Sequence, residues 1–450
     1  MFEVLARFFV TAAILATPLA ASSGPDEPAV QEQDPASSEA VEAEDSFSTE
    51  PGAEAPAPYS ERITVTATHW PTDIKDTPGA VSVIGRERIE ELGMKDVSDL
   101  LKFEPGVYVA SDLTRLGLGG FNIRGIGENR VLTQIDGVRT AEQFDFGPLA
   151  VPRYGVDLEL LESVEIIRSA GSALYGSDAL GGVVSFRTRT PGSYLSEVEG
   201  NLYLGLRTAY DGRNDETSES VAFAVGRGRW QGSLQISRRD GVETDNQGRV
   251  ASQDSTRTRP NPMDREATGA LAKLVHAPSA RAMLELTAEW YGTDTETAVL
   301  SGQGATPAGL VLDYDARDTN DRLRVSAEQW LVPERGILFG RLLWRVYASR
   351  DDTRQLTRLI FDRGEEGLSE QNGLLDFEQD MIGAELRLQK EFSAGASHRL
   401  TYGVDGFEQR FAIVRDRTEM FVATGEPVPT NLEFPTSYFP DSRVRSEEHV

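Results

Sequence analysis

The 450-residue sequence contains no cysteine and only four histidines. Without cysteine the chain can form neither a disulfide framework nor a thiolate metal site or nucleophile. The small number of histidines disfavours a histidine-rich metal centre. Basic residues number 45 against 72 acidic ones, which gives a formal net charge of -27. This balance argues against a nucleic-acid-binding protein, because such proteins need a basic surface to displace the counterions of the phosphate backbone.

The first 60 residues are expected to precede the folded domains. Residues 1–21 resemble a secretory signal peptide, with Arg7 near the start, a short apolar run and small residues before position 22. The run is short and broken by Pro18, which favours export over the alternative of a single membrane anchor. Residues 22–60 are rich in Pro, Ala, Ser, Glu and Asp and lack Lys and Arg, so we expect a disordered acidic linker.

Residues 61–190 are predicted to form a small α+β domain. Gly93 and the Pro105–Gly106 pair mark the ends of two short helical segments. Runs of β-branched and apolar residues before and after them predict short strands. The expected helices are 87–92 and 97–103, and the expected strands include 63–68, 80–84 and the segments GVYVA, FNIRG, RVLTQIDGV, ESVEIIRS and GGVVSFRTR.

A glycine-rich stretch in this domain, NIRGIGENRVLTQIDGVRT, raises the question of a nucleotide loop. A dinucleotide fingerprint needs a helix after the glycines, whereas RVLTQIDGV is typical of a strand. Charged residues recur within the β-type segments and should be paired or face water. A surface that docks inside a polar channel would satisfy them. The candidates for such an ionic lattice are Arg124, Asp136, Arg139, Glu165 and Arg168.

Several motifs in this region, in order, resemble the plug domain of TonB-dependent outer-membrane receptors. They are ITVTAT, GGFNIRGIGENRVLTQIDGVRT and RYGVDLELLESVEIIRSAGSALYGSDALGGVVSF. Their amino-acid sequences are most similar to those of the branch that takes up haem or haemoglobin iron. The chain departs from the family at Arg168–Ala170, where Arg-Ser-Ala replaces the usual Arg-Gly-Pro.

The resemblance implies a TonB box formed by Arg62, Ile63, Thr64, Val65, Thr66 and Ala67. A β-branched segment on a flexible tether can add as a strand to the sheet edge of a partner, here the energy-transducing protein TonB. The alternative is an ordinary first strand of the plug.

Residues 195–450 alternate apolar and polar side chains in segments of about ten residues, as expected of a transmembrane β-barrel. The segment SARAMLELTAEW places Leu284, Leu286 and Ala288 on one face and Glu285 and Glu289 on the other. Predicted tight turns alternate with longer polar connections, which a soluble β-sandwich would not readily produce. The tight turns lie near 226–229, 277–279, 332–336 and 393–397, and the longer segments near 241–266, 293–321, 350–377 and from 415 onward.

The expected fold is therefore a transmembrane β-barrel with an N-terminal α+β plug. Only about nine strands are recognisable, whereas a barrel that encloses a plug needs about 22. We therefore expect residues 195–450 to be the N-terminal portion of a truncated barrel. A fragment that transports nothing is one alternative.

No arrangement of residues predicts an enzyme, since ALYGSDALGG does not match the nucleophile motif G-x-S-x-G. The resemblance implies a receptor in the outer membrane that imports haem or haemoprotein iron, with a ferric siderophore as the alternative ligand. No intrinsic cofactor is expected, because haem or the iron chelate would be cargo, and no metal ligand is assigned. The expected partners are TonB, outer-membrane lipid and a host haemoprotein. Phe144, Phe146 and Tyr154 could contact the ligand, or pack on the barrel wall.

Overall fold

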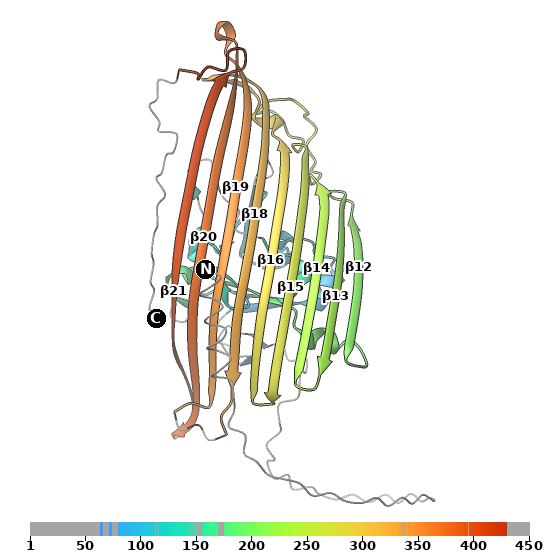
Figure 1. Ribbon diagram of the computed structural model, residues 1–450, viewed down its shortest axis with the longest axis vertical. Coiled ribbons are helices and arrows are strands. Elements are labelled where there is room, and N and C mark those ends of the chain that lie inside the picture. The colour runs from blue at the N-terminus through green and yellow to red at the C-terminus, as the bar shows by residue number, and fades with distance from the viewer. Residues whose placement is uncertain are drawn as a thin grey trace, which may run out of the picture. The chain divides into compact units, whose positions relative to one another are not determined.

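The computed structural model describes residues 64–65, 72–73, 80–112, 114–115, 117–143, 145–146, 149–150, 155–169, 175–334, 336, 338–394 and 396–429. The predicted signal peptide and acidic linker lie outside these residues. Figure 1 shows the described residues as one broad sheet of long strands with a smaller α+β domain against it. None of the described helices is both long enough and apolar enough to cross a bilayer.

The plug domain is built on a mixed five-stranded sheet in the order β3-β10-β11-β6-β7. All neighbouring pairs are antiparallel except β6 and β11, which run parallel. The strands are β3 (Val81–Gly85), β6 (Val131–Ile135), β7 (Val138–Arg139), β10 (Leu161–Ile167) and β11 (Gly182–Thr188). Apolar side chains of these strands form one large cluster with the helices, which includes Ile89, Leu100, Phe121, Ile166 and Phe186, and a second, smaller cluster that includes Leu132, Ile167 and Val183.

Short helices and two-stranded ribbons complete the plug. Asp96 caps the N-terminus of α3 by accepting a hydrogen bond from the backbone of Asp99 at 2.9 Å. Thr190 and Ser193 form a capping box that starts α5, at the junction with the barrel sheet. The helices are α2 (Arg86–Glu91), α3 (Val97–Leu101), α5 (Pro191–Leu195), η2 (Glu128–Arg130), η3 (Leu158–Leu160) and η4 (Ser177–Ala179); the ribbons pair β1 (Thr64–Val65) with β2 (Thr72–Asp73), β4 (Val107–Asp112) with β5 (Gly117–Ile123) and β8 (Asp145–Phe146) with β9 (Leu149–Ala150).

The second sheet contains ten strands, nine of which follow one another in chain order as antiparallel neighbours. β17 pairs only with β18. The nine-strand path confirms the predicted barrel-type architecture, and β12 and β21 form its two ends within the described part of the chain. The strands are β12 (Leu202–Asp211), β13 (Glu216–Arg227), β14 (Trp230–Val242), β15 (Met263–Ser279), β16 (Ala282–Ala298), β17 (Gly304–Thr306), β18 (Gly309–Leu331), β19 (Arg341–Asp362), β20 (Leu368–Ala394) and β21 (Ala396–Phe421).

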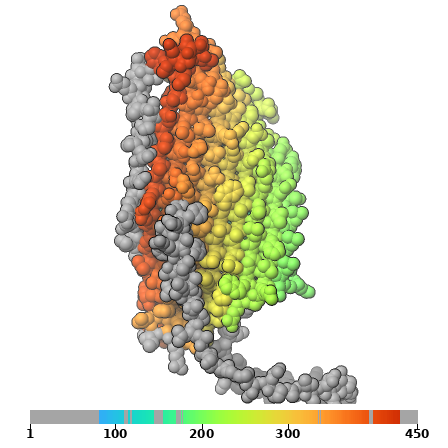
Figure 2. Space-filling model, viewed as in Figure 1, coloured from blue at the N-terminus to red at the C-terminus, as the bar shows by residue number. Residues whose placement is uncertain are grey.

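The two faces of this sheet differ in polarity. One face exposes large apolar side chains that are neighbours across strands, such as Leu206 opposite Val221 and Val221 opposite Ile236. Figure 2 shows this face, with the plug hidden behind it. The opposite face is polar and lies against the plug, as the contacts below show. A contiguous exposed apolar band of this kind indicates a surface that is covered by another apolar phase.

The strands extend well beyond the segments predicted from the sequence. β18, β19, β20 and β21 contain 23, 22, 27 and 26 residues. The prediction that residues 350–377 form a long polar loop was wrong, since β19 and β20 leave only residues 363–367 between them. Outward side chains in this part are charged, as at Arg350, Arg354 and Asp376, so both faces are polar and the apolar alternation that identifies a strand is lost.

Candidate functional site

A tight turn carries Asp136 from the plug to the polar face of the barrel sheet. Ile135 and Val138 are paired, and Asp136 and Gly137 between them have φ angles of 48° and 73°. Asp-Gly suits such a turn because both central residues need positive φ. The Asp136 carboxylate lies 3.0 Å from the guanidinium of Arg324 on β18 and 3.5 Å from Nζ of Lys273 on β15.

The surroundings of Asp136 keep its carboxyl group ionised. Burial alone would raise the pKa of Asp136, but Lys273, Arg324 and Thr188 outweigh burial and hold the pKa well below its usual range. Thr188 donates hydrogen bonds from its backbone N–H and its hydroxyl at 2.9 and 2.6 Å. The plug therefore presents a constant negative charge to the barrel wall.

The basic side chains that face Asp136 also pair with acidic side chains of the barrel strands. Lys273 donates to Glu285 at 2.8 Å, and Glu289 accepts from Arg322 at 2.6 Å and from Nε of Arg324 at 2.7 Å. Sequence reasoning missed these partners. The sequence carried only part of the signal: Glu285 and Glu289 stand on the predicted polar face, but the position of Glu289 opposite Arg324 follows from the strand register of the folded sheet.

Gly137 lets the turn approach the barrel wall closely. A Cβ atom at this position would lie 2.3 Å from Nη1 of Arg345. Arg345 donates to the Gly137 carbonyl at 3.2 Å and is held by Glu385 at 2.8 Å and by Glu328. The missing side chain therefore makes room for a barrel arginine that binds the plug backbone.

A second group of contacts fixes the helical side of the plug to the first barrel strands. Asp157, just before η3, accepts hydrogen bonds from Ser237 and Arg239 on β14. Asp99 on α3 pairs with Arg213, in the turn after β12, at 3.0 Å. Burial would raise the pKa of Asp99, but hydrogen bonds from Arg213 and Lys102 outweigh it and lower the pKa to about 2.

The five residues predicted to form an ionic lattice do not form a single network. Arg139 donates to Asp178 at 2.7 Å and lies 5.0 Å from the ring centre of Phe407 on β21, so it links the plug to the barrel as Asp136 does. Arg124 lies in a turn at the end of β5, where its φ angle is 52°. Its side chain is exposed and forms no ion pair with a described residue.

Glu165 and Arg168 instead pair within the plug. The buried Glu165 lies 4.0 Å from Arg187 on the neighbouring strand. Arg168 pairs with Glu104 at 3.2 Å and donates to the hydroxyl of Ser82 at 2.8 Å. These two residues hold plug segments together.

Most of the predicted partner and ligand contacts lie outside the described residues. Within the TonB box only Thr64 and Val65 are described, and as β1 they pair with Asp73 and Thr72 of β2. Arg62, Ile63, Thr66 and Ala67 lie outside, as do Phe144 and Tyr154. The backbone of Phe146 forms part of β8. These predictions stay predictions.

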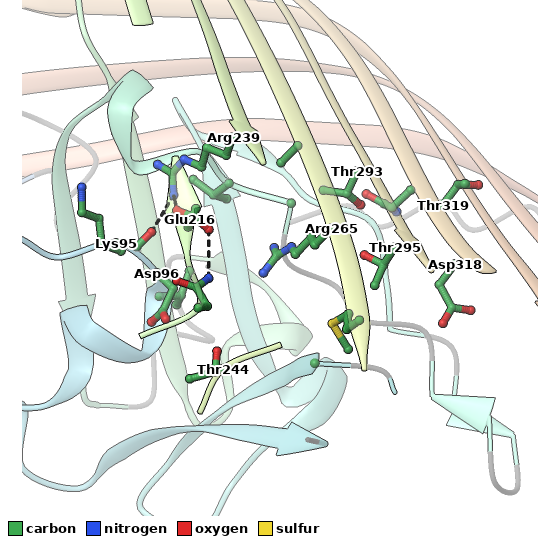
Figure 3. A pocket seen from close by; sticks show the side chains of 18 of the residues that line it. Lys95, Asp96, Glu216, Arg239, Thr244, Arg265, Thr293, Thr295, Asp318 and Thr319 are labelled. Carbon is green, nitrogen blue, oxygen red and sulfur yellow. Dashed lines mark hydrogen bonds and ion pairs between the residues drawn. The ribbon is translucent and has the colours of Figure 1, made fainter. Parts of the chain in front are cut away.

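A cavity of about 180 Å³ lies between the plug and the barrel strands. The plug contributes residues around α3 and β5, among them Lys95, Asp96 and Arg115. The barrel contributes residues of strands β12 to β16, β18 and β19, among them Tyr291. Arg265 on β15 is labelled in Figure 3. No histidine lines the described part of this cavity. Within the described residues, no group of three or more His, Asp or Glu side chains could hold a metal ion.

Residues 73–183 match the family model described as the TonB-dependent receptor plug domain. Together with the plug-bearing sheet, this match decides the family. The chain belongs to the TonB-dependent receptors. This is a family of transport receptors.

Curated relatives and a solved structure agree with this assignment. The chain is 28% identical over 282 residues to the hemoglobin and hemoglobin-haptoglobin-binding protein A of Haemophilus influenzae, covering 58% of this chain and 26% of that protein. It is 36% identical over 171 residues to the iron-regulated outer membrane virulence protein of Vibrio cholerae, covering 37% of this chain and 25% of that protein. The outer-membrane ferripyoverdine receptor of Pseudomonas aeruginosa has a similar fold, with a TM-score of 0.55 and 14% identity over 86% of this chain and 49% of that one. The matched region thus spans about a quarter of each curated relative.

Proposed function

We propose that the protein is an outer-membrane receptor that imports iron carried by haem or a haemoprotein, with energy transmitted by TonB. The observation that carries this proposal is a plug held by buried ion pairs against the polar face of a sheet whose other face is apolar. An apolar outer face suits lipid, and the plug would close the lumen until TonB acts on it. The relatives that bind haemoglobin support the choice of haem iron.

The test is iron-limited growth of a receptor-deficient strain that carries the full-length gene, with haem or haemoglobin as the iron source. The variant Val65→Pro should abolish growth, because proline removes a backbone N–H that β-strand addition to TonB would use. A matched control is Val65→Ala, which shortens the side chain but keeps the backbone N–H at the same position. Growth of the Val65→Pro variant equal to wild type would contradict energised uptake.

A ferric chelate is the second candidate cargo, and the cavity favours it. Its described lining is largely polar and charged and includes no histidine and one tyrosine, the buried Tyr291, although histidine and tyrosine are the common haem ligands. Growth on a ferric siderophore, but not on haem, would replace haem by this alternative and leave the transport function in place.

A further inference from the structure

The lining of the cavity between plug and barrel includes an exposed arginine that has no carboxylate partner among the described residues. Four arginines line it, and three of them have carboxylate partners. Arg115 pairs with Asp318 at 2.7 Å, Arg213 pairs with Asp99 and Asp211, and Arg239 pairs with Asp157. Arg265 forms no ion pair and no hydrogen bond with any residue that the structure describes.

The register of the barrel strands explains why Arg265 has no partner. Its neighbours directly across are Gly241 on β14 and Thr295 on β16, and neither carries a carboxylate. The hydroxyls of Thr293 and Thr295 line the same cavity. Figure 3 shows the Arg265 side chain extending from β15 into the space beside the plug, with no dashed line to another residue drawn there.

The acidic groups of the lining are already engaged. Asp318 binds Arg115, and Asp211 binds Arg213. Glu216 accepts a hydrogen bond from Asn214 at 3.3 Å and lies 3.9 Å from Arg239. Asp96 caps helix α3 and also accepts a hydrogen bond from Ser98 at 2.6 Å. Lys95 adds another positive charge to the lining. The part of the cavity around Arg265 therefore attracts an anion.

We propose that Arg265 binds a carboxylate group of the transported ligand in this cavity, an inference that rests on the proposed function. A guanidinium offers two parallel N–H donors that match a carboxylate, and the threonine hydroxyls can add further hydrogen bonds. The cavity of about 180 Å³ is smaller than the roughly 300–1,000 Å³ that enclose a whole drug-sized ligand. It therefore holds one acidic arm of the ligand. Haem propionates and carboxylate-bearing ferric chelates share this chemistry.

The test compares ligand binding by the purified full-length receptor with binding by two variants of Arg265. Arg265→Gln should weaken the binding of haemin, or of ferric citrate, about 10- to 100-fold, the size expected when a hydrogen bond to a charged group is lost. Arg265→Lys should bind with an affinity between those of the wild type and Arg265→Gln, because lysine keeps the positive charge but lacks the two parallel N–H donors of a guanidinium. Haemin dimethyl ester, whose propionates are neutral, should bind wild type and Arg265→Gln equally. Whichever of haemin and ferric citrate responds identifies the source of the carboxylate.

Arg317→Gln is the matched control, because Arg317 is an exposed arginine of the same sheet that pairs with Asp294 at 2.6 Å, and its loss should leave binding unchanged. Unchanged binding of both carboxylate ligands by Arg265→Gln would overturn the inference, and growth that still depends on Val65 would then leave the proposed function intact. If the wild-type receptor supports no growth on any of these iron sources, both proposals fail.

Discussion

Asp136 illustrates how a single residue can be structural at a domain interface. Its carboxylate meets Lys273 and Arg324, and the three basic and three acidic groups of this cluster balance when Arg322, Glu285 and Glu289 are included. Charges buried in this way stabilise little compared with a well-packed apolar contact, but removing one of them leaves its partner uncompensated. The cluster therefore makes docking of the plug specific for its own barrel wall.

Replacing Asp136 by asparagine should lower the free energy of unfolding of the full-length receptor by roughly 3 kcal/mol, because one buried positive charge loses its partner. Adding Lys273→Met restores the net charge of the cluster but leaves Glu285 without its 2.8 Å donor, so it should recover only part of this loss. Urea unfolding of the receptor in detergent measures both effects.

The control for this experiment is Glu91→Gln, which breaks an exposed pair with Arg88 and should change stability by less than about 1 kcal/mol. A double variant no more stable than Asp136→Asn would show that charge balance is not what the cluster provides.

At the scale of single elements, sequence reasoning located strands well and their ends poorly. β10 and β11 fall on the predicted segments ESVEIIRS and GGVVSFRTR, because β-branched residues are concentrated there. The long barrel strands were cut short where their outward residues become charged. β20 shows this change within one strand, with Asp376 in its first part and Ile382 and Leu386 further along.

This change within β20 predicts where charge is tolerated. Under the proposed function Leu386 faces lipid, so Leu386→Arg should cost about 2–4 kcal/mol of folding free energy and reduce insertion. Leu374, on the same outward face of β20 but among charged residues, should accept arginine at a cost of about 0–1 kcal/mol. Folding yield of the full-length receptor in lipid vesicles compares the two variants. An equal loss of folding yield in both variants would contradict the prediction that only Leu386 faces lipid.

At the scale of the whole molecule, docking of the plug should resist mild acid. The pKa of Asp99 is lowered to about 2 and the pKa of Asp136 is also depressed, so both groups stabilise the docked state fully above their ordinary pKa of about 3.9. This stabilisation is lost as the pH falls from about 4 towards 2. For Asp99 we expect this stabilisation to be on the order of 1 kcal/mol, since water around the half-exposed Arg213 weakens the ion pair.

The measurement is the difference in unfolding free energy between the wild-type receptor and Asp99→Asn as a function of pH. It should be constant from pH 7 to pH 5 and shrink below pH 4. A difference that disappears near pH 6 would mean that a histidine or another group, and not Asp99, controls docking.

The architecture of the whole molecule could be predicted from motifs and alternation, but the interface could not. Asp136 and Arg139 were recognised because charged residues are unusual in strand-like segments. Lys273 and Arg324 were not, because charges are ordinary on the polar face of a barrel strand and nothing local links them to a turn more than a hundred residues away. Whether these residues contact Asp136 depends on the order and register of the barrel strands, which are defined only in the folded chain.

The close fit of Gly137 against Arg345 has a consequence for how the sequence can change. A side chain at position 137 would displace Arg345, and a different residue at position 345 would leave the Gly137 carbonyl without its donor. Although more than two hundred residues separate the two positions, a substitution at either one should loosen the contact between the plug and the barrel sheet.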